Sequence, residues 1–408
     1  MAIRTARTRT SSACNWARPA SIRPVSINRL RFLALAASVL VAAAAGGYAW
    51  FQASVPAGPA EPAVILGDGK DTPGGMAWIP PGVFLMGSNS RLAQRNERPA
   101  HPVRVRGFWM DVTHVTNDQF AEFVRRTGYV TTAERKPDWD TIRVQLPPGT
   151  PRPPDTVLVP GAMVFVGTAG PVDLSDYSQW WRYVPGADWR HPQGPGSSIE
   201  GKGDHPVVQV SYADVQAYAR WAGKRMPTEA EWEYAARGGL EQATYVWGDE
   251  LMPDGQPMAN YWDLGQGTFP VVKPEAGGAA GTLPVTSFPA NGYGLYDMTG
   301  NAWQWAADWY DARYFARQAK AAQGKPIDDP QGPPQSYDPS DPGVPVSAPK
   351  RVIRGGSFLC NENYCLSYRP SARQASDPAS PMSHVGFRLV SDAPPPASPS
   401  LLARLWSH

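Results

Sequence analysis

Proline and glycine make up about one residue in five of this 408-residue chain, with 44 Pro and 39 Gly. Proline disrupts helix interiors and central strands, and glycine is favoured where the backbone turns. The chain is therefore not expected to form long helices or a broad regular sheet. It also contains 16 Trp and 16 Tyr, and such large side chains can bury a substantial core. We expect a folded, turn-rich protein with much irregular backbone.

The charge balance argues against a nucleic-acid partner. The formal net charge is +2, and 18% of the residues are charged. Proteins that bind nucleic acid usually carry a basic stripe or patch on the folded part. No such concentration is present in the body of the chain, so we predict that it binds no nucleic acid.

The N-terminal region carries a membrane signal. Residues 1–31 contain seven Arg and no Asp, Glu or Lys, and the twenty residues 32–51 that follow are uncharged. Twenty residues at helical rise can cross a bilayer, and Arg-rich flanks stay in the cytoplasm. We predict a cytoplasmic leader at 1–31 and a single transmembrane helix at 32–51, with the remaining chain outside the cytoplasm. A cleavable export signal is the alternative, because residues 42–45 are small, and a buried soluble helix is a third reading.

The amino-acid composition divides the rest of the chain into a linker, a folded domain and a tail. Residues 52–73 are rich in Ala, Pro and Gly and are predicted to be a linker, and residues 74–392 to be the folded domain. The Pro-rich residues 393–408 are predicted to be a disordered tail. Segments 135–160 and 317–350 are crowded with Pro and Asp and are expected to be surface excursions.

Three short helices are predicted by capping residues followed by an apolar face. They begin at Thr116, Ser211 and Thr228 and end near Gly128, Gly223 and Gly238. Alternating apolar residues predict strands at 103–109 and 207–210. Short helices and strands scattered through an irregular chain indicate an α+β fold.

The cysteines are the first candidates for chemistry. The chain has three, and two of them, Cys360 and Cys365, stand five apart behind a Gly-Gly-Ser turn, whereas Cys14 lies in the Arg-rich leader. Two thiolates on one loop can bind a soft metal ion. They can equally close a structural disulfide, which an extracytoplasmic location permits.

Several motifs are typical of one known family. They are Gly82–Gly87 (Gly-Val-Phe-Leu-Met-Gly), Trp221–Glu233, Asn291–Met298, Gly300–Trp305, Arg354–Phe358 and Gly386–Arg388. Together they resemble the formylglycine-generating enzyme, or sulfatase-modifying factor, family over most of the chain. The resemblance implies a C-type-lectin-like fold with little regular secondary structure. The domain serves several activities, so these motifs alone do not identify the reaction.

The spacing of the two cysteines is a more specific signal of the activity. In formylglycine-generating enzymes two cysteines follow the Gly-Gly-Ser-Phe motif with four residues between them, as Cys360 and Cys365 do here. Trp189–Pro192 and Asp204–Pro206 also look like the enzymes. Structural cysteines of some members are replaced by Ala235, Pro370 and Leu389.

The resemblance implies a copper-dependent oxidase. Cys360 and Cys365 would hold Cu(I), with Cys365 facing the substrate and Cys360 more buried. The substrate would be a cysteine within Cys-x-Pro-x-Arg of an unfolded or nascent type I sulfatase, which O2 oxidises to Cα-formylglycine. Ser357 would lie near the sulfurs and donate a hydrogen bond. An oxidising location would require a reductant or copper loading to keep the pair reduced.

A groove for the extended substrate is also implied. Trp303, Tyr364, Arg373 and His384 occupy positions that look like groove residues of the family. Each has another interpretation from its residue type alone. Trp303 can be a core residue, and Arg373 can form a structural ion pair.

Structural calcium is the last implied feature. The matching positions are Asp297, Gly300, Ala302 and Gln304 at one site and Asn260 and Tyr261 at a second. Calcium prefers several hard oxygens that include carboxylates. Gln304 replaces an acidic residue at the first site, and residues 276–279 lack the acid expected at the second, so both sites are weakened.

Other functions of the same fold remain open. Iron-dependent sulfoxide synthases need a three-histidine site and an added helical domain, whereas this chain has six His with no i, i+4 pair. A non-catalytic, membrane-tethered binding protein with a structural Cys360–Cys365 disulfide is the main alternative. A serine hydrolase has no support, because the Gly-x-Ser-x-Gly motif is absent.

Overall fold

The computed structural model describes residues 64–262, 267–272 and 281–395. The predicted leader, membrane helix and most of the linker and tail therefore lie outside the described residues. Among the residues that the structure describes, no helix is long and apolar enough to cross a membrane.

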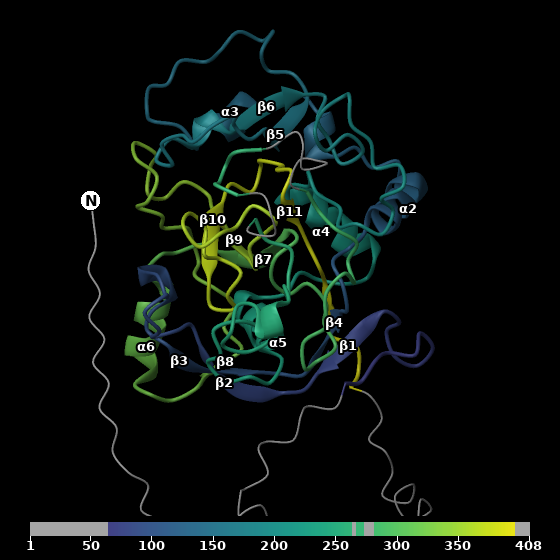
Figure 1. Cartoon of the computed structure of the whole chain (residues 1–408), viewed down its shortest axis with the longest axis vertical. Helices are drawn as coiled ribbons and strands as arrows, with labels where there is room; N and C mark the ends of the chain where they lie inside the picture. Colours follow the sequence, from purple (N-terminus) through teal and green to yellow (C-terminus); the bar gives the residue numbers. More distant parts are fainter. Residues whose placement is uncertain (1–63, 263–266, 273–280, 396–408) are drawn as a thin grey trace, which may run out of the picture. The chain divides into compact units, whose positions relative to one another are not determined.

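Four small sheets supply the strands of the described part of the chain (Figure 1). Two have three strands each: β1 (Met76–Ile79), β4 (Phe108–Asp111) and β12 (Val390–Ser391) in one, and β2 (Gly82–Met86), β3 (His101–Val105) and β8 (Ile327–Asp328) in the other. The largest has the order β10-β9-β7-β11, formed by Arg373–Ser376, Arg351–Arg354, Trp303–Trp309 and Val385–Gly386. The last is a hairpin of β5 (Gly161–Phe165) and β6 (Trp181–Pro185). This mixture of short elements confirms the α+β prediction.

The α-helices within the described ranges are α2 (Asn117–Thr127), α3 (Trp139–Arg143), α4 (Tyr212–Trp221), α5 (Glu229–Arg237) and α6 (Tyr314–Ala322). The three predicted helices are confirmed, and each begins with a capping box on its expected N-cap residue. In these boxes the N-cap side chain and the third helical residue satisfy each other's free backbone N–H groups. Helix α3 was not foreseen within the segment 135–160.

One predicted strand is wrong and another is divided. The stretch 103–109 forms β3 and β4 instead of one continuous strand. Residues 207–210 form no strand, because the backbone of Gln209 has φ 60°, in the left-handed region. Its side chain donates hydrogen bonds to the carbonyl oxygens of Met163 and Pro192, which fix this conformation.

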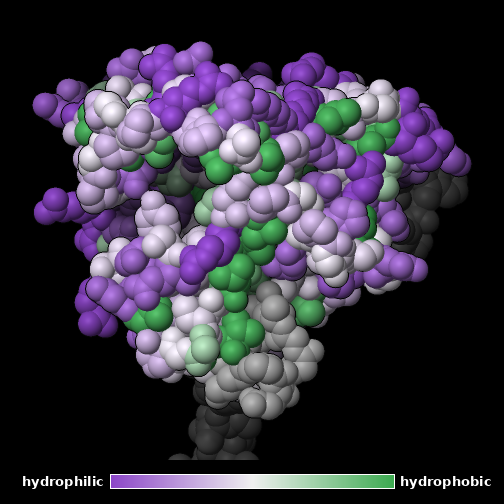
Figure 2. Space-filling view, turned by 90° about the horizontal axis from the view of Figure 1, so that it is seen from above, coloured by the Kyte–Doolittle hydropathy of each residue, from purple (hydrophilic) through white to green (hydrophobic). Residues whose placement is uncertain are grey.

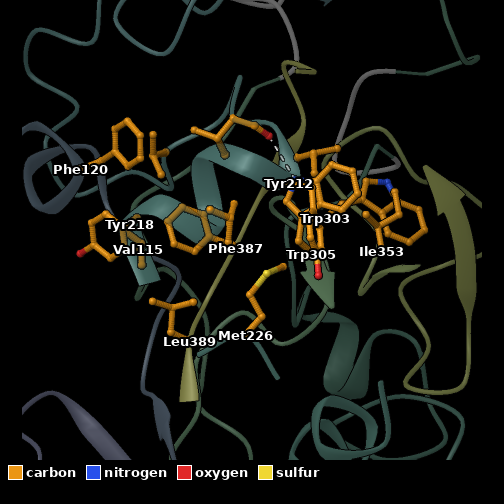
Figure 3. Packing of buried hydrophobic residues seen from close by; sticks show 14 of the residues in the cluster. Val115, Phe120, Tyr212, Tyr218, Met226, Trp303, Trp305, Ile353, Phe387 and Leu389 are labelled. Atoms are coloured by element: carbon orange, nitrogen blue, oxygen red, sulfur yellow. Dashed lines mark hydrogen bonds between the residues drawn. The ribbon is translucent and has the colours of Figure 1, made fainter. Parts of the chain in front are cut away.

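The largest apolar core packs α2 and α4 against β7 and the chain around Phe387 (Figure 3). Phe120, Tyr218 and Phe387 form its aromatic centre, with ring centroids 5.3–6.5 Å apart. Trp303 and Ile353 belong to the same core and also line a pocket at its edge. The core therefore supports one wall of that pocket.

Buried ion pairs fix the strands next to this pocket. Glu229 of α5 accepts from Arg354 of β9 and from Arg373 of β10, at 2.6 Å in each case. Arg354 also pairs with Glu233 one turn further along α5, at 2.7 Å. All four side chains are at most 1% exposed. Since buried charges are costly unless they are paired, this network holds α5, β9 and β10 in a single arrangement.

Candidate active site

The cysteine loop begins directly after β9, at two glycines. Gly355 and Gly356 have φ values of 92° and 71°, which glycine adopts without strain. A Cβ on Gly355 would lie 2.6 Å from the carbonyl oxygen of Met298, so the backbone also approaches too closely for another side chain. The glycines thus turn the chain sharply out of the sheet and into the loop that carries both cysteines.

Cys360 and Cys365 lie together in this loop. Their Cα atoms are 4.6 Å apart, and the structure joins their sulfurs in a disulfide. Cys360 is 1% exposed and Cys365 is half-buried. Both line a pocket of about 320 Å³, which we call the cysteine pocket. The pocket residues are Trp181, Phe269, Trp303, Ile353, Ser357, Leu359, Cys360, Tyr364, Cys365, Gln374, Ala375, Ser376, Met382 and His384.

Ser357 lies at the start of the loop and is fully buried. Its oxygen accepts a hydrogen bond from the backbone N–H of Leu359 at 3.2 Å. Its carbonyl oxygen accepts from the N–H of Cys360 at 2.9 Å, which ties the serine to the first cysteine. A hydroxyl carries one proton to donate, and among the described residues no acceptor is seen for it.

Aromatic side chains form the walls of the cysteine pocket. Trp303 is 3% exposed, whereas Tyr364 is 42% exposed and its ring stacks on that of Phe269, with centroids 4.8 Å apart. The ring of His384 lies 4.7 Å from that of Trp181. The predicted residues Trp303, Tyr364 and His384 thus line the same pocket as Cys360, Cys365 and Ser357.

His384 contributes a neutral imidazole. Burial lowers the pKa of His384 to about 3, because the cation would lose its hydration. Its Nδ1 is buried and has no hydrogen-bond partner among the described residues. The ring can therefore offer one donor or acceptor to a bound molecule without carrying a charge.

Trp181 and Phe269 were missed by the sequence analysis. Trp181 reaches the pocket from β6, and Phe269 from a short described segment between two undescribed ones. No local sequence signal places either residue at this pocket. Trp180 is fully buried, and Trp181 is half-buried and faces the pocket.

Arg373 is not among the residues of the cysteine pocket. Its guanidinium is buried and binds both carboxylate oxygens of Glu229 at 2.6 Å. The groove role predicted for it is therefore corrected to the structural ion pair. The next three residues of β10, Gln374, Ala375 and Ser376, line the pocket instead.

The first predicted calcium site does not fit the ion. The Gln304 side chain donates from Nε2 to the carbonyl oxygens of Asp297 and Met298, and its Oε1 accepts from Trp232 and Arg388. The carbonyl oxygen of Ala302 accepts from His114 at 2.9 Å. These oxygens are already bonded to N–H donors, and the Arg388 cation lies among them.

Asp297 is the one carboxylate at this position. Its Oδ1 is buried without a partner, and burial raises the pKa of Asp297 to about 7 despite the nearby Arg388. A carboxyl group with such a pKa is largely neutral in mildly acidic solution. Together with the bonded oxygens, this leaves too few free hard donors for calcium.

At the second predicted calcium site, residues 276–279 lie outside the described residues, and the two described residues offer no carboxylate. The side-chain N–H2 of Asn260 donates to the carbonyl oxygen of Gly281 and to Asn301 Oδ1, and the backbone carbonyl oxygen of Asn260 accepts from the N–H of Asn301. Tyr261 packs in the core, with its ring 5.0 Å from that of Tyr368. Nowhere in the described ranges do three His, Cys, Asp or Glu residues form a metal-binding group.

The fold and pocket define a class of protein with two adjacent sulfur atoms at the base of an aromatic cleft. A model of the sulfatase-modifying factor enzyme 1-like domain matches residues 62–393. The chain is 47% identical to formylglycine-generating enzyme of Mycobacterium tuberculosis over 77% of its length and 96% of that protein. It is 46% identical to formylglycine-generating enzyme of Thermomonospora curvata, over 78% of its length and 93% of that protein.

The chain therefore belongs to the formylglycine-generating enzyme, or sulfatase-modifying factor, family. Its identity to the inactive Cα-formylglycine-generating enzyme 2 of mouse is lower, 34% over 81% of the chain and 90% of that protein. The homology places the chain with the enzymes of the family.

Proposed function

We propose that this protein is a copper-dependent oxidase that converts the cysteine of a Cys-x-Pro-x-Arg segment in sulfatases to Cα-formylglycine with O2. The observation that carries the proposal is the pair of adjacent sulfurs, Cys360 and Cys365, lining an aromatic pocket. The full family resemblance and the homology to formylglycine-generating enzymes support the same activity.

The two cysteines fit Cu(I) once they are reduced to thiolates. Soft sulfur ligands select Cu(I) over hard cations, and the half-buried Cys365 leaves one side of the pair open to the pocket. When bound there, Cu(I) would supply a centre at which O2 can be reduced next to the substrate sulfur. A closed disulfide offers no thiolate, so the active form requires two-electron reduction of Cys360–Cys365.

The reaction has a definite electron balance. The substrate side chain loses its C–S bond and one Cβ hydrogen and gains a C=O bond, so that the thiol becomes an aldehyde with release of hydrogen sulfide. The other atom of O2 leaves as water, and this step takes up two electrons and two protons beyond those of the substrate. Two added thiol groups can supply these electrons and protons by forming one disulfide.

The surrounding side chains would hold the substrate and exclude water. The Ser357 hydroxyl can donate to a sulfur or oxygen in the pocket, and the neutral His384 adds no competing cation. Trp303, Tyr364 and Trp181 offer flat apolar surfaces to an extended peptide. We propose that the partner is an unfolded or nascent sulfatase, because a folded sulfatase would not present an extended segment.

The cellular location is part of the proposal. The Arg-rich residues 1–31 and the apolar residues 32–51 support a single-pass protein of the cytoplasmic membrane with its catalytic domain outside. Cleavage after the apolar stretch would instead release an exported enzyme. Either arrangement places the cysteine pair where a reductant must be supplied.

A copper titration tests the metal assignment. The reduced protein is titrated with Cu(I) in competition with a coloured chelator, without O2. We expect one Cu(I) per chain, with loss of this binding in Cys360→Ala and in Cys365→Ala. The second candidate function, a non-catalytic binding protein, is favoured by the disulfide seen here, and it predicts no tight copper binding even after reduction.

A further inference from the structure

A second cavity lies beside the cysteine pocket, between α3 and the β5–β6 hairpin. Its volume is about 340 Å³, and we call it the α3 cavity. Helix α3 and the segment before it form one wall, the hairpin forms another, and residues 379–381 form the third. Segment 135–160, expected to be a mere surface excursion, thus helps to enclose a cavity. Figure 1 shows α3 next to β5 and β6, and Figure 2, seen from that end, shows the surface hollowed beside exposed hydrophobic groups.

The α3 cavity and the cysteine pocket share one face of the hairpin. Trp181 lines the cysteine pocket and Tyr183 the α3 cavity, and residues two apart in a strand point to the same side. Met163, which is paired with Tyr183, also lines the α3 cavity. A molecule in the cysteine pocket can therefore continue along this face into the α3 cavity.

The stretch of chain that lies alongside β5 also borders both hollows. Residues 381–384 run beside β5, where the N–H of Met163 donates to Pro381 and the N–H of Ser383 donates to Met163, each at 3.0 Å. Pro381 lines the α3 cavity, whereas Met382 and His384 line the cysteine pocket. A single stretch of four residues thus connects the two hollows.

The chemistry of the α3 cavity favours an apolar occupant. Its interior surface includes Pro137, Ile142, Met163, Tyr183 and Pro381. The charged groups belong to exposed residues: Lys136 pairs with Asp155 at 3.0 Å, and the Asp138 carboxylate caps α3 by accepting from the N–H and hydroxyl of Thr141. Arg135 is bonded to the carbonyl oxygen of Val130. The lining is therefore mostly apolar, and its one carboxylate, Asp138, uses Oδ2 to cap α3.

We propose that the α3 cavity binds an apolar side chain of the substrate polypeptide, outside the segment that fills the cysteine pocket. This inference rests on the proposed function. The two strand residues from Trp181 to Tyr183 span about 6.6 Å, which equals about two residues of an extended substrate. The occupant therefore lies at least two residues beyond the part held at the cysteines, and it adds selectivity for sulfatases with an apolar residue there.

The test measures how the full chain converts two peptides of equal length. The protein is supplied with Cu(I), O2 and a thiol reductant. Both contain the same Cys-x-Pro-x-Arg core and about six residues on each side; the flanks of one carry Leu and Phe, and those of the other Ser and Asn. We expect kcat/KM for the apolar peptide to exceed that for the polar one by about tenfold, the usual effect of burying one apolar side chain.

Three variants assign this preference to the α3 cavity. Ile142→Asn makes the cavity polar, and Ala379→Trp fills it from the opposite wall, so each should bring the ratio of the two kcat/KM values close to one. Val144→Asn is the matched control, because Val144 is an exposed apolar residue at the end of α3 that does not line the cavity. It should keep the tenfold ratio.

The outcomes separate the inference from the function on which it rests. Failure of the wild-type protein to convert either peptide would overturn the proposed function and this inference with it. Equal conversion of both peptides by the wild type would overturn the inference alone. So would a preference that survives in both cavity variants, or one that Val144→Asn removes to the same extent.

Discussion

Single residues determine how the cysteine pocket is built. Gly355 and Gly356 allow the left-handed turn that brings Ser357, Cys360 and Cys365 to one place. Only glycine adopts such φ values readily, and the carbonyl oxygen of Met298 leaves no room for a Cβ on Gly355. The position of both sulfurs therefore depends on two residues that carry no chemistry themselves.

Six of the fourteen pocket residues could be predicted from the chain, because they lie in or near recognisable motifs. The two cysteines, Ser357, Trp303, Tyr364 and His384 all line it. Trp181 was missed because it arrives from a hairpin distant in sequence, and no local signal fixes which strand meets the loop. Arg373 was misplaced because only the fold brings it to its partner Glu229.

The buried carboxyl group of Asp297 predicts that the stability of the protein depends on pH. Burial raises the pKa of Asp297 to about 7, above its ordinary value of 3.8. The folded state therefore holds this proton more tightly, and the resulting contribution to stability is complete below about pH 4 and lost as the pH rises through 7. Asp297→Asn should flatten this dependence. The free energy of unfolding of the variant, relative to that of the wild type, should be higher at pH 8 than at pH 5 by at least about 1 kcal/mol.

Thermal unfolding of both proteins between about pH 5 and pH 8 measures the effect. Asn suits the φ of 48° at this position, so the backbone should not be strained. If the two Tm curves run parallel across this range, Asp297 does not titrate as the structure indicates.

At the level of elements, α5 joins the sheet through charges instead of apolar packing alone. Glu229 and Glu233 pair with Arg354 and Arg373 in the interior, and Arg354 is the last residue before the two glycines. The network thereby fixes the strand end from which the cysteine loop departs. A buried carboxylate that loses its partner is strongly destabilising.

Arg373→Met should therefore lower the free energy of unfolding by about 3–5 kcal/mol, because Glu229 would lose one of its two cationic partners. Arg143→Met is the matched control, since Arg143 pairs with Asp140 on the surface, where both side chains are more than half exposed. That variant should change stability by less than about 1 kcal/mol. Denaturant unfolding compares the two, and equal effects would mean that the buried pair does not hold α5 to β10.

Helices were predicted better than strands for a physical reason. A capping box needs only four neighbouring residues, so Thr116, Ser211 and Thr228 identify helix starts from local sequence. Strands need partners from elsewhere in the chain. The stretch 207–210 has strand-like residues, but the distant carbonyl oxygens of Met163 and Pro192 hold Gln209 in a left-handed conformation.

At the scale of the whole molecule, small sheets, short helices and long irregular segments are held together by several separate apolar cores and by buried ion pairs. Such a chain could rely on bound calcium for stability, as the family resemblance implies. The carbonyl oxygens of Asp297 and Met298 are instead bonded to side-chain N–H groups of Gln304 and Arg388. These hydrogen bonds tie the region together through protein groups.

Calcium removal should accordingly have little effect. We expect the Tm of the full chain to be the same in excess EGTA and in millimolar calcium, because the described residues leave too few free oxygens for the ion. Gln304→Glu restores a carboxylate at this position and serves as the comparison. A clear fall in the Tm of the wild type on chelation would contradict the assignment of Gln304 as an internal replacement for calcium.

The most direct test of the central claim is mass spectrometry of a Cys-x-Pro-x-Arg peptide incubated with the reduced full chain, Cu(I), O2 and a thiol reductant. The account predicts conversion of the cysteine to an aldehyde that requires copper and is abolished in Cys360→Ala and in Cys365→Ala, while both variants stay folded. An unchanged peptide, with the wild-type thiols shown to be reduced and the protein folded, would contradict it. So would full activity in both variants.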